Sequence, residues 1–251
     1  VSWLTCDLAQ CWDMARFPQH LDVIIHLAQS RRFREFPEAA PDMLAVNVTS
    51  TLRLLDYARQ AGVRQFIYTS SGGGYQRGPR VESDAFQAND QRNFYVATKS
   101  YGETLVQQYA TFFLTTILRP FFVYGIAQHP HMLMPRLIRS VQEERPIRLS
   151  SATGIRINPI YNLDVVEVLE RCLTLQQPCT LNIAGNEILS IRQMSDMIGS
   201  VLGKAAQFTT DGEEEGDLIG DIRLLEERLG YRPHTPFHVG MAHMCHAAGR
   251  R

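Results

Sequence analysis

Short apolar runs and amphipathic stretches alternate along the first two thirds of the chain. Four runs are almost continuously apolar, which is typical of strands in a parallel sheet covered on both faces. These runs are residues 22–27, 65–69, 115–119 and 180–184. Helical periodicity occupies Pro41–Gln60 and Tyr95–Ala110 between them. The alternation predicts a doubly wound α/β fold with a parallel sheet.

The last third of the chain carries explicit helix signals. Ser190 and Gln193 have the spacing of a capping box before an apolar-periodic segment, and Gly203 follows the end of that segment. A second helical segment begins at Asp221 and is followed by Gly230. The pattern predicts a helix-rich C-terminal region that differs from the sheet region before it.

Composition mainly excludes classes of partner. The chain has 251 residues, a formal net charge of −1 and 20% charged residues, so we expect no nucleic-acid or anionic-membrane surface. No apolar run approaches the roughly 18 residues that cross a bilayer. The five cysteines are scattered and lack CxxC spacing, which favours a reduced, cytoplasmic protein. His243 and His246 lack a second ligand cluster, so no metal site is expected.

Three consecutive glycines occur within residues 67–78, which read IYTSSGGGYQRG. A loop that holds the pyrophosphate of a dinucleotide must follow a strand and open a helix, whose N–H groups meet the anion. A strand precedes these glycines, but the polar residues after Tyr75 do not continue as a helix, and GxGxxG spacing is missing. The glycines therefore predict a tight turn at the end of a strand.

Tyr95 and Lys99 lie four residues apart at the start of a predicted helix, hence on one face. An ammonium group beside a phenol stabilises the phenolate and lowers its pKa, which suits general acid–base catalysis near neutral pH. The spacing alone is common, and a solvated helix face is the alternative interpretation.

Eight stretches together resemble the extended short-chain dehydrogenases/reductases of the nucleotide-sugar epimerase/dehydratase type. They are DLAQ at 7–10, DVIIHLAQ at 22–29, NVTSTLRLLDYARQAGV at 47–63, IYTSSGGGY at 67–75, YVATKSYGE at 95–103, LRPFFVYG at 118–125, NPIYNLDVVE at 158–167 and LNIAG at 181–185. The resemblance implies a Rossmann-like NAD(P)-binding domain and a smaller C-terminal α+β substrate-binding domain. The NAD(P)-binding domain is expected to span residues 1–125, and residues 155–185 are expected to return to it. The substrate-binding domain is expected to consist of residues 126–154 and 186–251.

The resemblance also implies a role for each site residue. Tyr95 would be the catalytic acid/base, Lys99 would lower its pKa and hold the nicotinamide ribose, and Ser71 would hydrogen-bond the reacting oxygen. The cofactor-binding residues would be Asp7, Leu27, Ala28, Asn47 and Thr69, together with Tyr95 and Lys99. Substrate would meet Ser71, Phe122 and Arg156. Asn47 is alternatively structural, and Thr69 is alternatively a packing residue.

The glycine-rich loop of the family belongs to a first βαβ unit that would lie ahead of Val1. We therefore expect a sheet that lacks this unit, and a strand at Val1–Thr5 without its usual neighbour. The expectation is an N-terminally truncated piece of an enzyme. An intact relative that repaired its sheet in another way is the alternative.

The substrate side departs from the family pattern. The family often has asparagine in RPxNxYGP, where this chain has RPFFVYGI at 119–126. An arginine that commonly binds the sugar-nucleotide diphosphate would align with Ile157, and Arg156 is one position off. In a regular strand Arg156 would point the other way. Residues 213–215 are glutamates where relatives often carry another phosphate-binding arginine nearby.

The expected function is NAD(P)-dependent epimerase/dehydratase chemistry on a sugar, with NAD favoured over NADP as the cofactor. The alternatives are a reductase or dehydrogenase of a non-nucleotide carbonyl, and a catalytically silent binding protein. Expected partners are a small sugar substrate and a second copy of the chain, which would dock through the helices following Asn47 and Tyr95.

Overall fold

The four apolar runs form neighbouring strands of one sheet in the computed structural model, which describes residues 2–85, 94–210 and 216–248. The strand order is β1-β2-β4-β9, and both β1–β2 and β2–β4 pair in parallel. The strands are β1 (Val23–His26), β2 (Gln65–Thr69), β4 (Leu114–Pro120) and β9 (Cys179–Ile183). The predicted α/β fold class is confirmed.

The described chain divides into two units. The first consists of Val1–Tyr75, Asp84–Arg119 and Cys172–Leu181. The second consists of Gln76–Ser83, Pro120–Arg171 and Asn182–Arg251. Each unit has its own hydrophobic core.

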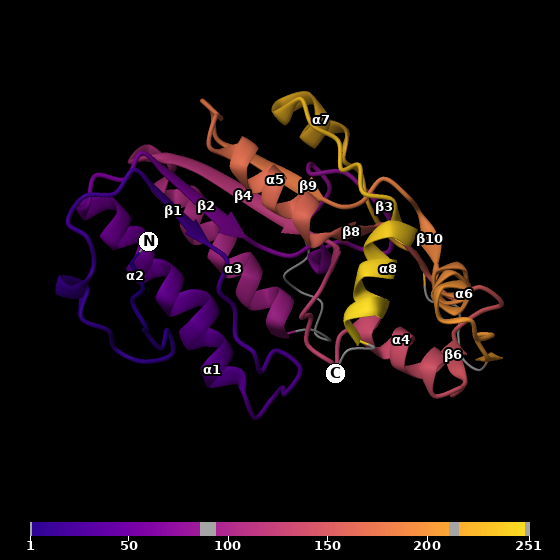
Figure 1. Cartoon of the computed structure of the whole chain (residues 1–251). Coiled ribbons are helices and arrows are strands. Elements are labelled where there is room, and N and C mark those ends of the chain that lie inside the picture. Colours follow the sequence, from indigo (N-terminus) through magenta and orange to yellow (C-terminus); the bar gives the residue numbers. More distant parts are fainter. Residues whose placement is uncertain (1, 86–93, 211–215, 249–251) are drawn as a thin grey trace. The chain divides into compact units, whose positions relative to one another are not determined.

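Helices cover one face of the sheet in the first unit, where α2 and α3 run side by side (Figure 1). Its helices are α1 (Ala40–Leu44), a π-helical turn (Ala45–Thr49), α2 (Ser50–Gln60) and α3 (Phe94–Gln108), with 3₁₀ turns at Met14–Arg16, Gly72–Gly74 and Tyr109–Thr111. Leu55 of α2 and Val106 of α3 pack against Phe66 and Ile117 of the sheet. The helices predicted at Pro41–Gln60 and Tyr95–Ala110 are therefore present. The first is interrupted by the π-helical turn at Ala45–Thr49.

The strand expected at Val1–Thr5 is wrong for residues 2–5, which contain no regular secondary structure. Trp3 is 92% exposed and Leu4 is 41% exposed. A strand is stable only where a neighbour satisfies its backbone groups and its apolar side chains become buried. Neither condition holds there.

The second unit contains short sheets and a helical layer. Its strands are β3 (Gly78–Arg80), β5 (Phe122–Tyr124), β6 (Ile147–Leu149), β7 (Arg156–Ile157), β8 (Pro159–Tyr161), β10 (Leu189–Ser190), β11 (Phe208–Thr210) and β12 (Leu218–Gly220). They form a sheet of order β10-β7-β12-β3 and the pairs β5–β8 and β6–β11.

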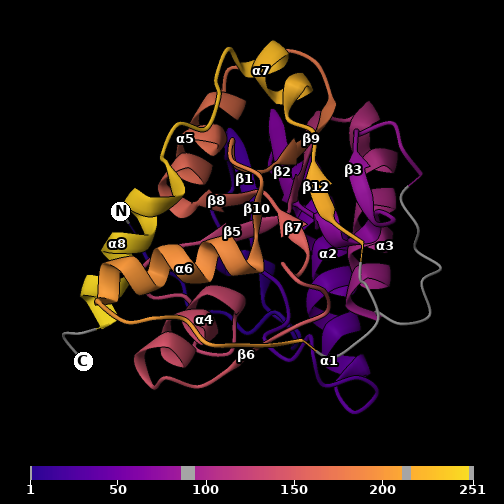
Figure 2. The same cartoon turned by 90° about the vertical axis from the view of Figure 1, so that its right-hand side faces the viewer.

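The helices of the second unit are α4 (Leu133–Gln142), α5 (Asn162–Cys172), α6 (Ile191–Leu202), α7 (Arg223–Leu229) and α8 (Phe237–Ala248). Helix α6 packs against α4 and α8, as Figure 2 shows. The predicted capping box at Ser190 and Gln193 is present, and Gly203 ends the helix in the left-handed region with φ +66°. Among residues 2–85, 94–210 and 216–248, no helix is long and apolar enough to cross a membrane.

Candidate active site

The candidate site of the first unit lies where β1 and β2 end. Because the two strands are parallel, the residues after His26 and after Thr69 meet at the same edge of the sheet. The segment after β1 brings Gln29, and the segment after β2 brings Ser71. This edge is where open α/β sheets bind their ligands.

The three glycines form a 3₁₀ turn that begins directly after Ser71. The Ser71 hydroxyl caps this turn by accepting a hydrogen bond from Gly73 N at 3.2 Å. None of the three glycines has a positive φ, so the turn does not need their backbone freedom. A Cβ at Gly73 would lie 3.3 Å from Ser71 Oγ and 3.5 Å from Val96 Cγ2, so its lack of a side chain lets Ser71 and α3 approach closely. The predicted turn is confirmed.

Tyr95 begins the first turn of α3 and is half-buried. Its hydroxyl donates to Gln29 Oε1 at 2.6 Å and also shares a hydrogen bond with Ser71. The ring of Phe33 packs against the Tyr95 ring with 5.3 Å between centroids. The structure thus brings Tyr95 and Ser71 together, as the sequence predicts.

Lys99 lies one turn further along α3 and is fully buried. Its Nζ donates to Thr69 O at 2.8 Å and lies 5.2 Å from the centroid of the Tyr68 ring. Burial lowers the pKa of Lys99 from 10.5 to about 7. The side chain therefore changes charge near neutral pH, which the spacing of Tyr95 and Lys99 alone does not reveal.

Burial raises the pKa of Tyr95 above its ordinary value of 10.0, and the hydrogen bond with Ser71 offsets only part of this. The charge of Lys99 is not among the causes that shift this pKa, so the lowering of the Tyr95 pKa by Lys99 stays a prediction. The Lys99 ammonium itself bonds the Thr69 carbonyl and is destabilised by burial. A phenol held neutral in this way is a proton donor.

Asn47 connects the segment after β1 to α3. Its Oδ1 accepts from Ser30 N at 2.8 Å, and its Nδ2 donates to Thr98 Oγ1 at 2.9 Å. Thr98 Oγ1 in turn donates to the Tyr95 carbonyl at 2.7 Å. Both ends of the buried Asn47 amide have protein partners, which favours the structural alternative for this residue.

His26 is a buried residue of the first unit whose ring nitrogen has a protein partner. It is 3% exposed, and its Nε2 lies 3.0 Å from Thr51 Oγ1. Because the Thr51 hydroxyl donates to the Asn47 carbonyl at 2.8 Å, Nε2 must carry the donated proton. Burial, and then the charge of Lys99, lower the pKa of His26 to about 3. The imidazole is therefore neutral at physiological pH.

The remaining residues predicted to bind cofactor also lie in the first unit. Asp7 is exposed, and its Oδ1 accepts from Ala9 N at 3.0 Å. Leu27 is 53% exposed, and Ala28 is partly exposed beside it. Thr69 Oγ1 is buried with no hydrogen-bond partner in the described part of the chain. The neighbouring Ser70 Oγ is likewise buried and has no hydrogen-bond partner among the described residues.

Glu103 lies on the same face of α3 as Tyr95 and Lys99. Both of its carboxylate oxygens accept from the buried Arg119, at 2.9 and 2.6 Å. Arg119 also donates to the Tyr75 hydroxyl. This pair ties α3 to the end of β4 and to the turn that carries Ser71.

Two of the three predicted substrate residues, Phe122 and Arg156, lie in the second unit, whereas Ser71 lies in the first. Phe122 on β5 is half-buried against that unit's core. Arg156 is exposed while Ile157 is fully buried, so the expected alternation is present. The Arg156 guanidinium donates to Asp217 Oδ2 at 2.8 and 2.6 Å. The glutamates at 213–215 lie outside the described residues.

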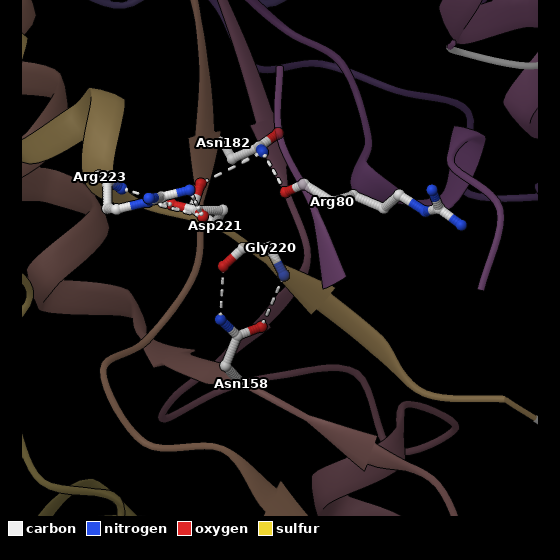
Figure 3. Close-up of polar contacts among 6 residues, drawn as sticks. All are labelled: Arg80, Asn158, Asn182, Gly220, Asp221 and Arg223. Atoms are coloured by element: carbon white, nitrogen blue, oxygen red, sulfur yellow. Dashed lines mark hydrogen bonds and ion pairs between the residues drawn. The ribbon is translucent and has the colours of Figure 1, made fainter. Parts of the chain in front are cut away.

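Two buried asparagines, which the sequence did not single out, organise strand β12 of the second unit (Figure 3). Asn158 Nδ2 donates to Gly220 O at 2.8 Å, and Gly220 N donates to Asn158 Oδ1 at 3.0 Å. Asn182 Nδ2 donates to the carbonyls of Arg80 and Asp221. These amides add to the regular pairing of β12 with β3 and β7, so their role is to hold the ends of β3 and β12.

Gln29 was also missed, although it directly contacts the candidate acid/base. A polar amide shortly after an apolar strand was the available signal, because the carboxyl ends of parallel strands carry binding residues. No group of three or more histidines, cysteines and acidic residues that could hold a metal ion occurs within residues 2–85, 94–210 and 216–248.

Known proteins resemble the chain over most of its length. dTDP-D-glucose 4,6-dehydratase from Mus musculus is 27% identical over 236 residues, which cover 89% of this chain and 66% of that enzyme. UDP-glucuronate 4-epimerase from Thermodesulfobacterium geofontis is 24% identical over 88% of this chain and 70% of its own length. The crystal structure of UDP-glucuronic acid 4-epimerase from Bacillus cereus with NAD superimposes with a TM-score of 0.82. It is 24% identical, and the match covers 95% of this chain and 78% of that one.

The family profile described as NAD dependent epimerase/dehydratase matches residues 1–184. This match spans the stretches that contain Ser71, Tyr95 and Lys99. It confirms the predicted family, whose description names NAD as the cofactor that the family uses. The chain belongs to the NAD dependent epimerase/dehydratase family.

Proposed function

We propose that this protein performs NAD-dependent epimerase or dehydratase chemistry on a nucleotide-linked sugar, with Tyr95, Lys99 and Ser71 as its catalytic residues. The observation that carries the proposal is the group formed at the end of β2. The Tyr95 phenol bonds Ser71 there, and Lys99 is buried one turn away with a pKa near 7. Perturbed groups that meet at the carboxyl edge of a parallel sheet are typical of catalytic sites.

Each residue has a distinct task in this chemistry. NAD, when bound, accepts hydride from the sugar carbon and can return it. Tyr95 exchanges a proton with the sugar hydroxyl at its phenol oxygen. Ser71 orients that sugar oxygen by a hydrogen bond, and the Lys99 ammonium holds ribose hydroxyls and stabilises the phenolate when it forms.

The residues at the β2 edge fit the ribose end of such a cofactor. The buried hydroxyls of Thr69 and Ser70 have no partner in the described part of the chain, and a buried polar group normally has one. A ribose, which carries both donors and acceptors, could satisfy them. Leu27 and Ala28 offer an apolar wall on the neighbouring segment, and Asp7 an acceptor.

The test is the activity of Tyr95→Phe with UDP-glucuronic acid, UDP-glucose and dTDP-glucose in the presence of NAD. Loss of the acid/base should lower turnover by about 10²- to 10⁴-fold. Tyr101→Phe is the matched control, because Tyr101 lies on the same helix and is 50% exposed. Undiminished turnover by Tyr95→Phe would exclude the assigned role.

One observation favours a second candidate, a reductase or dehydrogenase of a non-nucleotide carbonyl. The Arg156 guanidinium is already bonded by Asp217, which leaves it poorly placed to bind a diphosphate. Oxidation of NADH by simple aldehydes or ketones, without turnover of any nucleotide sugar, would support this candidate. Failure to bind NAD at all would instead support a silent binding protein.

We also propose that the first unit binds cofactor and the second binds substrate, with expected ranges of 1–125 plus 155–185 and of 126–154 plus 186–251. The two units of the structure differ from these ranges, because Gln76–Ser83 and Pro120–Arg171 belong to the second unit. Of the residues 155–185 expected in the first domain, only Cys172–Leu181 belong to the first unit. The support is that Tyr95 and Lys99 lie in the first unit and Phe122 in the second.

The proposed homodimer would form through α2 and α3. Both helices expose apolar side chains, because Leu52 is 43% exposed and Tyr101 is 50% exposed. Leu44 in the preceding α1 is 41% exposed as well. Leu52→Glu should shift the sedimentation coefficient from dimer to monomer, and an unchanged dimer would exclude this face.

A further inference from the structure

Gln29 is the protein's own partner for the Tyr95 hydroxyl. It lies three residues beyond the end of β1, and its side chain is exposed while its Oε1 accepts from the phenol at 2.6 Å. The amide oxygen therefore occupies the place where an acceptor atom of a ligand would have to be in order to bond Tyr95.

The backbone around Gln29 is fixed. The next residue, Ser30, is 1% exposed, and its N–H donates to Asn47 Oδ1 at 2.8 Å. The Ser30 hydroxyl bonds Asp42, and Arg32 N donates to Ser30 Oγ at 3.1 Å. The side chain of Gln29 can consequently rotate without any change in the segment that carries it.

The same segment covers the Tyr95 ring as well as its hydroxyl. Phe33 packs on the ring of Tyr95, and Phe36 stacks on Phe94 with 5.0 Å between centroids. These contacts hold the segment against the start of α3. Of the contacts that this segment makes with Tyr95 and Phe94 as described above, the hydrogen bond from Tyr95 to Gln29 is the one that involves an atom needed in the proposed chemistry.

We propose that Gln29 is an access-controlling residue, whose amide satisfies the Tyr95 hydroxyl and must be displaced before a ligand oxygen can bond it. This rests on the proposed function, because the displacing ligand would be the sugar hydroxyl or the ribose of NAD. A glutamine suits the task. Its neutral amide accepts from a neutral phenol, and its exposed side chain loses little when it rotates into water.

The first experiment needs no ligand. Acetylation of tyrosine hydroxyls by N-acetylimidazole is followed by mass spectrometry in the wild type, Gln29→Ala and Gln29→Glu. We expect acetylation of Tyr95 about 3- to 10-fold faster in Gln29→Ala, the equivalent of one hydrogen bond. In Gln29→Glu it should be slower than in the wild type, because a carboxylate is a stronger acceptor. Tyr109, partly exposed in the 3₁₀ turn after α3, is the internal control.

The second experiment measures binding of NAD and of UDP-glucuronic acid by calorimetry. Gln29→Ala should bind at least one of them about 3- to 10-fold more tightly, and Gln29→Glu more weakly. The gain should vanish in a Tyr95→Phe background, where Gln29 has no hydroxyl to cover. A general structural role of Gln29 would not produce this dependence on Tyr95.

The two experiments separate this inference from the proposed function. If neither ligand binds any variant, the proposed function fails, and the acetylation rates alone decide whether Gln29 covers Tyr95. Equal acetylation of Tyr95 in all three proteins would overturn the inference. Weaker ligand binding by Gln29→Ala would also overturn it, because Gln29 would then be a ligand contact.

Discussion

Helices α3 and α6 bury opposite kinds of side chain in their respective units. Helix α3 buries Lys99 and Glu103 beside its apolar residues. Helix α6 buries Ile191, Met194 and Ile198, and its one buried hydroxyl bonds its own backbone. Burial of charge is costly unless it is paired, whereas burial of apolar area is the main driving force of folding. Helix α6 therefore stabilises its unit, whereas the buried charges of α3 are destabilising and belong to the candidate active site.

The largest effect should come from the charged pair on α3. In Glu103→Gln the buried Arg119 loses its carboxylate, and an uncompensated buried charge costs about 3–5 kcal/mol. Urea denaturation gives the free energy of unfolding. Asp56→Asn on α2 is the control, because its ion pair with Arg59 is nearly half exposed and should contribute at most about 1 kcal/mol. Equal losses in the two variants would mean that burial does not distinguish these pairs.

In α6 the corresponding change removes apolar volume. Ile198 is fully buried in the core of the second unit, so Ile198→Ala should lower the free energy of unfolding by about 2–5 kcal/mol. The exposed Asp196→Ala should stay within about 0.5 kcal/mol of the wild type. The loss should be the same at pH 6 and pH 9, in contrast to changes on α3. A pH-dependent loss would contradict the purely apolar role of α6.

Lys99→Met tests directly how much the buried lysine lowers the free energy of unfolding. The unfolded chain keeps the lysine proton up to about pH 10.5, whereas the folded protein loses it above about 7. The unfolded state therefore binds more protons between these values, and stability should rise with pH by up to about 1.4 kcal/mol per unit. Lys99→Met should lack this rise and be more stable than the wild type at pH 6, with little activity. Parallel pH curves for the two proteins would show that Lys99 is not destabilised by burial.

The same contrast explains what could be predicted from the sequence. Helix α6 was predicted closely, because capping residues and apolar periodicity are local signals. The positions of Tyr95, Lys99 and Ser71 followed from their spacing and from the family resemblance. The pKa of Tyr95 was not predictable, because it depends on burial and on the direction of the Lys99 ammonium.

Contacts between distant segments were also hidden from the sequence. Gln29 and Tyr95 are 66 residues apart, and the parallel pairing of β1 and β2 together with the hydrogen bonds of Asn47 brings the segment of Gln29 to α3. Likewise, the Arg119–Glu103 pair joins a strand to a helix that precedes it. The strand expected at Val1–Thr5 is absent from residues 2–5, because the family pattern supplies a strand there only together with the neighbour that pairs with it.

The smallest effect should come from the cap of α6. Ser190 Oγ accepts from Gln193 N at 3.1 Å, and Gln193 Oε1 accepts from Ser190 N at 2.9 Å. Ser190→Ala leaves the Gln193 N–H without its acceptor and should cost about 1 kcal/mol in urea denaturation. Gln193→Ala, which removes the other half of the box and keeps the serine, should cost less, because Gln193 is exposed. Because neither change touches a titrating group, both losses should be independent of pH and leave ligand binding by the first unit unchanged. A cap variant that altered NAD affinity would show that the two helices are energetically coupled.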